Sequence, residues 1–188
     1  MSWYVLGTAL GKEETAAELL KKKVDHELWE NCRVLKKQQL FRIQGKYFLN
    51  RKELFPGYLF IETQYPDRLA KELEKARDFP RFIGNGNTGI AAVEEKDLSF
   101  LRDICGEDLD EDMSLSLVRT DGEGRVTEAW GALKPYLKDI VRQRLRQRYV
   151  IAEVPLFGRR EEVLFGIRLP EDKIIDRYEN IIKEVKAG

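Results

Sequence analysis

Apolar positions in the first third of the chain switch between strand spacing and helix spacing. Residues 2–7 form a short apolar run that predicts a strand, and residues 12–24 carry apolar side chains at helical spacing. Residues 34–43 and 47–54 follow as two strand-like runs, separated by a turn that contains Gly45. A strand, a helix and a hairpin are therefore expected at the start of the fold.

The clearest local signal lies at residues 54–62, which read LFPGYLFIE. Pro56 fixes φ and Gly57 permits a tight turn, and the aromatic and branched side chains after them favour a buried strand. We expect this turn to lead directly into a core strand. Pro66 then begins a predicted helix that ends before Pro80.

A strand at residues 81–83 and a helix at residues 94–104 complete the first half of the chain. This mixture predicts an α+β protein whose first domain, residues 1–106, is a small α/β sandwich. The acidic stretch 107–116 has few apolar residues that could pack, and we expect it to be a linker.

Residues 117–169 form the second predicted domain, in which two patterns compete. Apolar side chains from Leu133 to Tyr149 recur at helical intervals. Alternation instead predicts two barrel strands, with four arginines on one face, namely Arg142, Arg144, Arg146 and Arg148. Turn chemistry at Pro155 and Gly158 favours the barrel, and a helical or switching domain is the alternative.

Residues 170–188 extend beyond this second domain. Isoleucine, tyrosine and valine side chains recur there at helical spacing, and Pro170, Glu171 and Asp172 form a favourable helix start. We expect a C-terminal amphipathic helix.

Composition narrows the classes of protein to consider. The chain has 188 residues, of which 43% are apolar, enough for two small cores but not for one large core with a deep catalytic cavity. Its 33 basic and 33 acidic residues are segregated along the chain, so local charged patches matter more than net charge. The chain lacks an apolar run of membrane-spanning length and a signal-peptide pattern, which predicts a cytoplasmic protein with no membrane partner.

Candidate catalytic residues are scarce. The single histidine, His26, lies in a charged stretch typical of a surface, and the chain lacks HExxH and GxSxG motifs. Residues 84–89, GNGNTG, lack the lysine of a phosphate loop. Cys32 and Cys105 lie far apart without CxxC spacing, which indicates neither a disulfide framework nor a zinc site. We expect no enzymatic activity, no cofactor and no metal.

The LFPGYLF segment and the order of elements around it resemble the NusG family of transcription factors. In the second domain, GALK at residues 131–134 and VPLFGR at residues 154–159 resemble the KOW module of this family, in particular that of specialised paralogs such as the antiterminator LoaP. The resemblance implies a ferredoxin-like NGN domain followed by a small SH3-like barrel. Because the related RfaH can hold its second domain as helices or as a barrel, it also implies the switching alternative.

The resemblance further implies that the first domain binds the clamp helices of RNA polymerase, beside the upstream DNA. The matching positions are aromatic or lie at the Pro56–Gly57 turn of the LFPGYLF segment, which we call the signature turn. They are Trp3, Tyr4, Phe41, Phe55, Pro56, Tyr58, Phe60 and Phe82. Because strand side chains alternate between two faces, roughly half of them are expected in the core and half at the surface.

Basic residues of the hairpin and the second domain are the candidates for nucleic-acid binding, because lysine and arginine neutralise phosphates. They are Lys36, Lys37, Arg42, Arg51, Lys52, Lys134, Arg142, Arg144, Arg146, Arg148, Arg159 and Arg160. LoaP-like proteins are associated with a hairpin in the nascent RNA, and such a duplex is recognised by shape and backbone. The expected function is that of a monomeric elongation and antitermination factor. The alternative is a housekeeping NusG-type factor that links polymerase to Rho or the ribosome.

Overall fold

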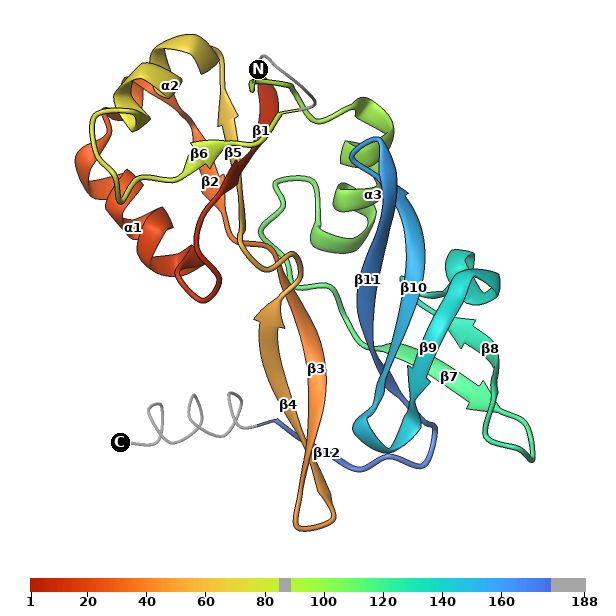
Figure 1. Cartoon of the computed structure of the whole chain (residues 1–188). Coiled ribbons are helices and arrows are strands. Elements are labelled where there is room, and N and C mark those ends of the chain that lie inside the picture. The colour runs from red at the N-terminus through yellow and green to blue at the C-terminus, as the bar shows by residue number, and fades with distance from the viewer. Residues whose placement is uncertain (85–88, 177–188) are drawn as a thin grey trace. The chain divides into compact units, whose positions relative to one another are not determined.

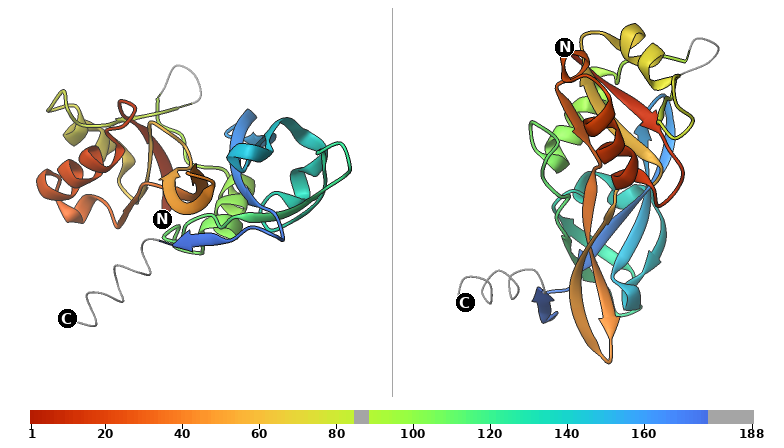
Figure 2. Two further views of the ribbon diagram at one scale, coloured as in Figure 1. Left: turned by 90° about the horizontal axis from the view of Figure 1, so that it is seen from below. Right: turned by 90° about the vertical axis from the view of Figure 1, so that its left-hand side faces the viewer.

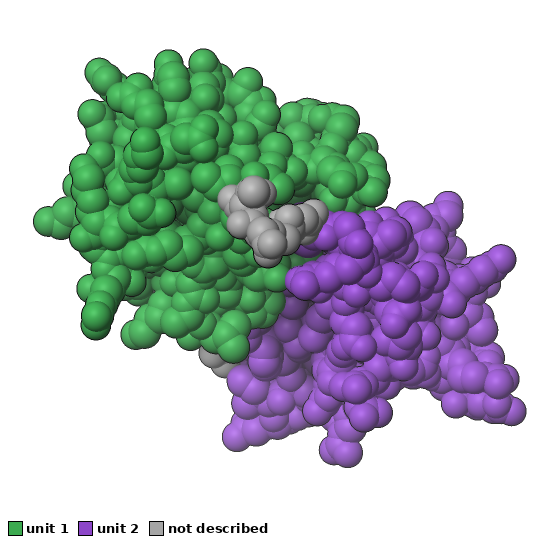
Figure 3. All heavy atoms as spheres, turned by 45° about the horizontal axis from the view of Figure 1, so that its top comes forward, with its two compact units in different colours: residues 1–35, 55–111 green, residues 36–54, 112–188 purple. Residues whose placement is uncertain are grey.

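The computed structural model describes residues 1–84 and 89–176 (Figure 1). These residues fall into two compact units, each assembled from two stretches of chain. The first unit comprises Met1–Leu35 and Phe55–Glu111, and the second comprises Lys36–Leu54 and the chain from Asp112 onward (Figure 3). The hairpin expected within the first domain thus belongs by its contacts to the second unit.

The first unit is built on an antiparallel sheet with the strand order β2-β5-β1-β6. Its strands are β1 (Ser2–Gly7), β2 (Asn31–Arg33), β5 (Tyr58–Thr63) and β6 (Arg81–Phe82). Its helices are α1 (Glu13–Lys23), α2 (Pro66–Leu73) and α3 (Glu95–Cys105), with a 3-10 turn at His26–Leu28. Helices α1 and α2 lie on one side of the sheet and α3 lies on the other (Figures 1 and 2). The α/β sandwich prediction is therefore confirmed.

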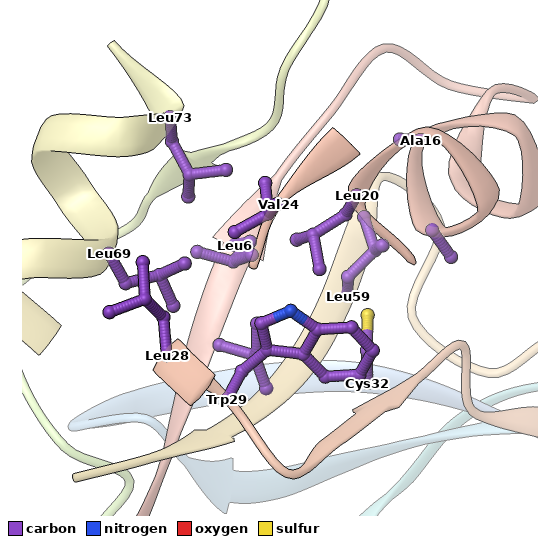
Figure 4. Close-up of a cluster of buried hydrophobic side chains, with 12 residues drawn as sticks. Leu6, Ala16, Leu20, Val24, Leu28, Trp29, Cys32, Leu59, Leu69 and Leu73 are labelled. Carbon is purple, nitrogen blue, oxygen red and sulfur yellow. The ribbon is translucent and has the colours of Figure 1, made fainter. Parts of the chain in front are cut away.

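The core of this unit lies between the sheet and helices α1 and α2. Leu6 and Leu59 are cross-strand partners, and both pack with Leu20 of α1 and Leu69 of α2 (Figure 4). Each such leucine is fully buried, which contributes about 1.5–3 kcal/mol of transfer free energy per side chain. The strand side chains that point the other way include the buried Phe60, so both faces of the sheet are covered.

The second unit contains a five-stranded sheet with the order β8-β7-β11-β10-β9. Its strands are β7 (Ser116–Thr120), β8 (Val126–Trp130), β9 (Ile140–Arg144), β10 (Tyr149–Leu156) and β11 (Arg159–Arg168). Two 3-10 turns, Lys134–Asp139 and Leu145–Gln147, interrupt the chain before and after β9. The barrel-like prediction is confirmed over the helical alternative.

Strand pairing explains why residues 133–148 do not form the helix that their apolar spacing favours. Val150 and Ala152 of β10 face Phe165 and Val163 of β11 in register, and all four side chains are buried. A helix over residues 133–148 would remove β9, and β10 would then lose the strand along its other edge, where Gln143 is opposite Val150 and Arg142 is opposite Ile151. The helical spacing survives only in the two short 3-10 turns.

The hairpin consists of β3 (Lys36–Ile43) and β4 (Lys46–Glu53). Its turn places Gln44 and Gly45 at φ 50° and 80°, the left-handed region expected of a tight hairpin turn. A third strand, β12 (Ile174–Asp176), pairs with β4 in parallel and gives the sheet order β12-β4-β3.

Two expectations from the sequence differ from the structure. Residues 107–116 are not a solvated linker throughout, because Leu109 and Met113 are buried and Met113 pairs through its backbone with Lys36 and Gln38. The C-terminal helix predicted over residues 170–188 is wrong at Ile174–Asp176, where backbone pairing with β4 makes the chain a strand. The rest of that predicted helix lies outside the described residues.

Candidate functional site

The turn of the LFPGYLF segment is held in place by a buried carboxylate. The backbone N–H of Gly57 donates to Oε1 of Glu13 at 2.7 Å, and the Gly11 N–H donates to the same oxygen at 3.2 Å. The Gly57 carbonyl accepts from the Thr8 N–H at 2.8 Å, and Gly57 itself has φ 84°. Glu13, at the start of α1, therefore joins two loops at one end of the sheet. It was not among the residues singled out in the sequence, because an acidic residue in a first helical turn is ordinary.

The aromatic residues proposed for polymerase binding divide into core and partly exposed groups. Trp3, Phe55 and Phe60 are buried, and the rings of Phe55 and Phe60 lie 5.9 Å apart. Tyr4 and Phe82 are half-buried and meet edge to face with their ring centroids 5.7 Å apart. Both are partly buried and pack against the core cluster.

Four apolar side chains lie around the signature turn and the end of β1 that pairs with it, and we call this set the apolar rim: Leu10, Pro56, Tyr58 and Ile83. Gly7 is the cross-strand partner of Tyr58, and a Cβ atom on Gly7 would lie 2.8 Å from Cδ1 of Ile83. A Cβ atom on Gly57 would lie 3.4 Å from Cδ2 of Leu10. Leu10 is 75% exposed and Ile83 40% exposed, while Tyr58 is half-buried.

Leu10 and Ile83 were also not singled out in the sequence. Each follows a strand end and lies next to a glycine in space, Gly57 for Leu10 and Gly7 for Ile83. The sequence feature that identifies such residues is a large apolar side chain in a loop rich in small residues. Phe41, by contrast, lies half-buried on β3 in the second unit, where Lys52 Nζ lies 5.5 Å from its ring centroid.

Several of the basic residues proposed for nucleic-acid binding form ion pairs with acidic residues of the second unit. Lys36 pairs with Glu53 at 3.3 Å, and Arg51 forms two hydrogen bonds with Asp112. The other paired arginines are Arg159, with Glu161, and Arg160, with Glu153 and Asp139. Such pairs neutralise each other and leave less charge for a ligand.

Lys37 lies buried on β3 beside Lys52, its cross-strand partner. Burial lowers the pKa of Lys37 to about 8, against the opposing effect of Glu53. A buried ammonium group cannot reach a phosphate on a ligand, so Lys37 is placed as a structural residue of the hairpin.

Six of the proposed cations are exposed and have no acidic partner within 4 Å among residues 1–84 and 89–176. They are Arg42, Lys52, Lys134, Arg142, Arg144 and Arg146. Arg142 and Arg144 lie on β9 and share one face of it. The prediction that all four arginines of this run share one strand face is wrong, because Arg146 lies in a 3-10 turn and Arg148 follows it in left-handed backbone.

Arg148 is a structural arginine rather than a surface cation. Only 9% of it is exposed, and its guanidinium forms a two-pronged pair with Asp172, with distances of 2.7 Å for Nε to Oδ2 and 2.6 Å for Nη2 to Oδ1. Its Cζ lies 4.4 Å from the centroid of the Tyr47 ring. Hydrogen bonding to Asp172 raises the pKa of Arg148. Burial alone would raise the pKa of Asp172, but the hydrogen bonds from Arg148 and the Leu169 N–H lower it.

Metal centres and membrane spans are two other classes of site that the described residues do not provide. Within the described ranges, histidine, cysteine and acidic side chains do not gather in groups of three or more that could hold a metal ion. The same residues include no helix with the length and apolar character needed to cross a membrane. What the described surface offers is an apolar rim in one unit and exposed arginines in the other.

Comparisons with known proteins agree with this description of the fold. The sequence model of a family described as "NusG: Transcription termination factor nusG" matches residues 1–102. A solved structure described as "Domain interaction in Thermotoga maritima NusG" has a TM-score of 0.54 and 20% sequence identity, over 88% of this chain and 93% of that chain. No curated protein matches the chain. Since the family match spans more than half of the sequence and the fold of a family member extends over most of the rest, the chain belongs to the NusG family of transcription factors.

Proposed function

We propose that this protein is a transcription elongation and antitermination factor that binds RNA polymerase through its first unit and nucleic acid through its second. Its proposed partners are the clamp helices of polymerase, the upstream DNA and the nascent RNA, and it acts as a monomer. Membership of the NusG family supports the polymerase half of this proposal. The observation that carries it is the apolar rim beside the signature turn.

The rim has the properties that a docking site for a helix tip needs. Leu10, Pro56 and Ile83 are exposed and Tyr58 is half-buried in the free protein, so a partner can cover them and gain about 25 cal/mol for each Å² of apolar surface buried. The hydrogen bonds from Gly57 and Gly11 to Glu13 hold the loops that carry Leu10 and Pro56 before binding. A preformed rim avoids the cost of ordering these loops in the complex. Tyr4 and Phe82 supply further aromatic edge on this unit, whereas Trp3, Phe55 and Phe60 support the site from the core.

The nucleic-acid half of the proposal is supported by the exposed cations of the second unit. Lysine and arginine side chains without acidic partners remain free to displace counterions from phosphates. The exposed arginines on β9 and the turn after it favour a specialised paralog that recognises a nucleic-acid signal, rather than a housekeeping factor whose second domain contacts Rho or the ribosome.

The polymerase half is tested by Ile83→Ser, which removes apolar surface from the rim without adding charge. We expect it to weaken capture of core RNA polymerase by the immobilised protein and to reduce terminator readthrough in a purified transcription assay. Tyr65→Ser is the matched control, since Tyr65 is 44% exposed at the start of α2, away from the rim. If a folded Ile83→Ser protein captures polymerase as well as the control does, the rim is not the docking site.

A further inference from the structure

The β3–β4 hairpin packs on the face of the second unit's five-stranded sheet toward which a side chain at Gly166 of β11 would point. A side chain at Gly166 of β11 would overlap the carbonyl oxygen of Gln38 on β3, so the two backbones approach closely there. The Gln38 side chain accepts a hydrogen bond from the Leu115 N–H at 3.2 Å, and its own backbone N–H donates to the Met113 carbonyl at 2.8 Å. The hairpin is therefore anchored at its base by these two hydrogen bonds and by a close backbone approach that requires a glycine at position 166.

A second contact lies near the hairpin tip, around Tyr47. Its hydroxyl donates to the carbonyl of Arg146 at 3.3 Å, and the Arg148 guanidinium covers its ring. Arg42 is the cross-strand partner of Tyr47, and its Cζ lies 6.0 Å from the ring centroid. Tyr47 thus connects the hairpin to the turn between β9 and β10.

The chain that leaves β11 fastens these two parts together. Asp172 holds Arg148 through two hydrogen bonds, and its carboxylate also accepts from the Leu169 N–H at 2.7 Å. Two residues later the same segment becomes β12 and pairs with β4, with Ile174 opposite Tyr47 (Figure 1). We call residues 169–176 the strap, because they join β11, the β9–β10 turn and the hairpin.

This arrangement places the hairpin tip beside the turn after β9, and these two segments carry cations that are about a hundred residues apart in sequence. Arg42 and Lys46 come from the hairpin, whereas Arg144 and Arg146 come from β9 and the turn after it. Arg144, Tyr149 and Gly166 form one cross-strand row on the face where the hairpin docks. All four cations are exposed, and none has an acidic partner within 4 Å in the part of the chain that the structure describes.

We propose that Arg42, Lys46, Arg144 and Arg146 form one composite site for the phosphate backbone of a nucleic-acid duplex, with Tyr47, Arg148 and Asp172 as its positioning residues. The proposal rests on the nucleic-acid half of the proposed function and deepens it. Backbone contacts depend on the spacing of cations along the duplex, so the two halves must be held in a fixed relation. Binding to a single strand is disfavoured, because it needs open aromatic faces for stacking and the Tyr47 ring is covered by Arg148.

The cations are tested by titrating the full-length protein into a labelled RNA stem-loop and a DNA duplex of the same sequence, at several salt concentrations. Arg42→Gln with Lys46→Gln, and separately Arg144→Gln with Arg146→Gln, should each weaken binding and lower the salt slope by about 1 for each phosphate that is no longer neutralised. Lys12→Gln with Lys23→Gln removes two exposed cations from the first unit as a control and should change neither quantity. The stem-loop and duplex arms show whether the backbone belongs to RNA or DNA.

The positioning residues are tested by a change whose electrostatic effect has the opposite sign. Asp172→Asn removes a negative charge, which by simple electrostatics would strengthen binding to phosphates. The composite site instead predicts weaker binding, because Arg148 loses its partner and the strap releases the hairpin. Glu171→Gln is the matched control, since it removes an exposed charge one residue away and should leave affinity unchanged or raised. Tyr47→Phe, which removes only the hydroxyl contact to Arg146, should weaken binding in a protein that keeps its fold.

The possible failures can be told apart. If the unaltered protein binds neither duplex, the nucleic-acid half of the proposed function is wrong, while polymerase capture still tests the other half. If it binds a duplex but only one pair of cations matters, or if Asp172→Asn binds as tightly as Glu171→Gln, the composite site is wrong and the proposed function stands.

Discussion

At the scale of single residues, buried charged side chains hold distant segments of this chain together. Glu13 and Arg148 both look like surface residues in the sequence, one in a basic and acidic helix and the other in an arginine run. Each is buried and connects segments that are distant along the chain: Glu13 reaches Gly57, and Arg148 reaches Asp172 and Tyr47. Removing one partner from such a contact leaves the other buried without compensation.

Glu13→Ala tests this for the signature turn. The change leaves the Gly57 N–H buried without an acceptor, which should lower the free energy of unfolding by about 1–3 kcal/mol. Glu18→Ala, on the exposed side of the same helix, should cost less than about 0.5 kcal/mol. Urea denaturation of both variants measures the difference, and equal stabilities would mean that the Glu13 hydrogen bonds contribute nothing net.

The Arg148–Asp172 pair gives a pH dependence with a definite sign. Because the pKa of Asp172 is lower in the folded chain than in the unfolded chain, where it is about 3.9, its ionised form stabilises the fold. This contribution is complete well above the unfolded pKa and is lost as the pH falls through the lower folded pKa. The difference in unfolding free energy between the unaltered protein and Asp172→Asn should therefore shrink on acidification. A difference that stays constant into acid would show that the pair does not depend on the carboxylate's charge.

At the scale of elements, short-range chemistry explains most of the helices and strands. Pro66 begins α2 as expected, and the Pro56–Gly57 turn leads directly into β5. The failures are at segments whose structure depends on a distant partner. β2 is a strand because it pairs with β5, and β12 is a strand because it pairs with β4, although its own apolar spacing is helical.

At the scale of the whole molecule, the β3–β4 hairpin packs with a different unit from the one that its place in the sequence predicts. It lies between β2 and β5 in sequence, yet its contacts are with β11, β12 and the turn after β9. Its basic residues therefore lie in the same compact unit as the arginines of β9 and the turn after it. The chain before Lys36 and the chain from Phe55 to Glu111 belong to the first unit.

Core substitutions in each unit can test this assignment. Phe165→Ala removes a fully buried side chain of β11 and should destabilise the second unit by about 3–5 kcal/mol. We expect hydrogen exchange at the amides of β3 and β4 to speed up in this variant. Leu20→Ala weakens the core of the first unit instead and should leave the hairpin amides unchanged. Faster hairpin exchange in Leu20→Ala alone would assign the hairpin to the first unit.

Features that depend on near neighbours follow from the sequence alone. It was sufficient for the α/β sandwich, for the hairpin turn at Gly45, and for the turn at Pro56 and Gly57, because φ restrictions and apolar spacing act within a few residues. It also identified the basic residues as a set. Which of them are paired or buried depends on the tertiary structure, because a cation's partner can come from anywhere in the chain. Arg148 is the clearest case, since its role depends on Asp172 and Tyr47, and these meet only when the hairpin and the strap have folded onto the barrel.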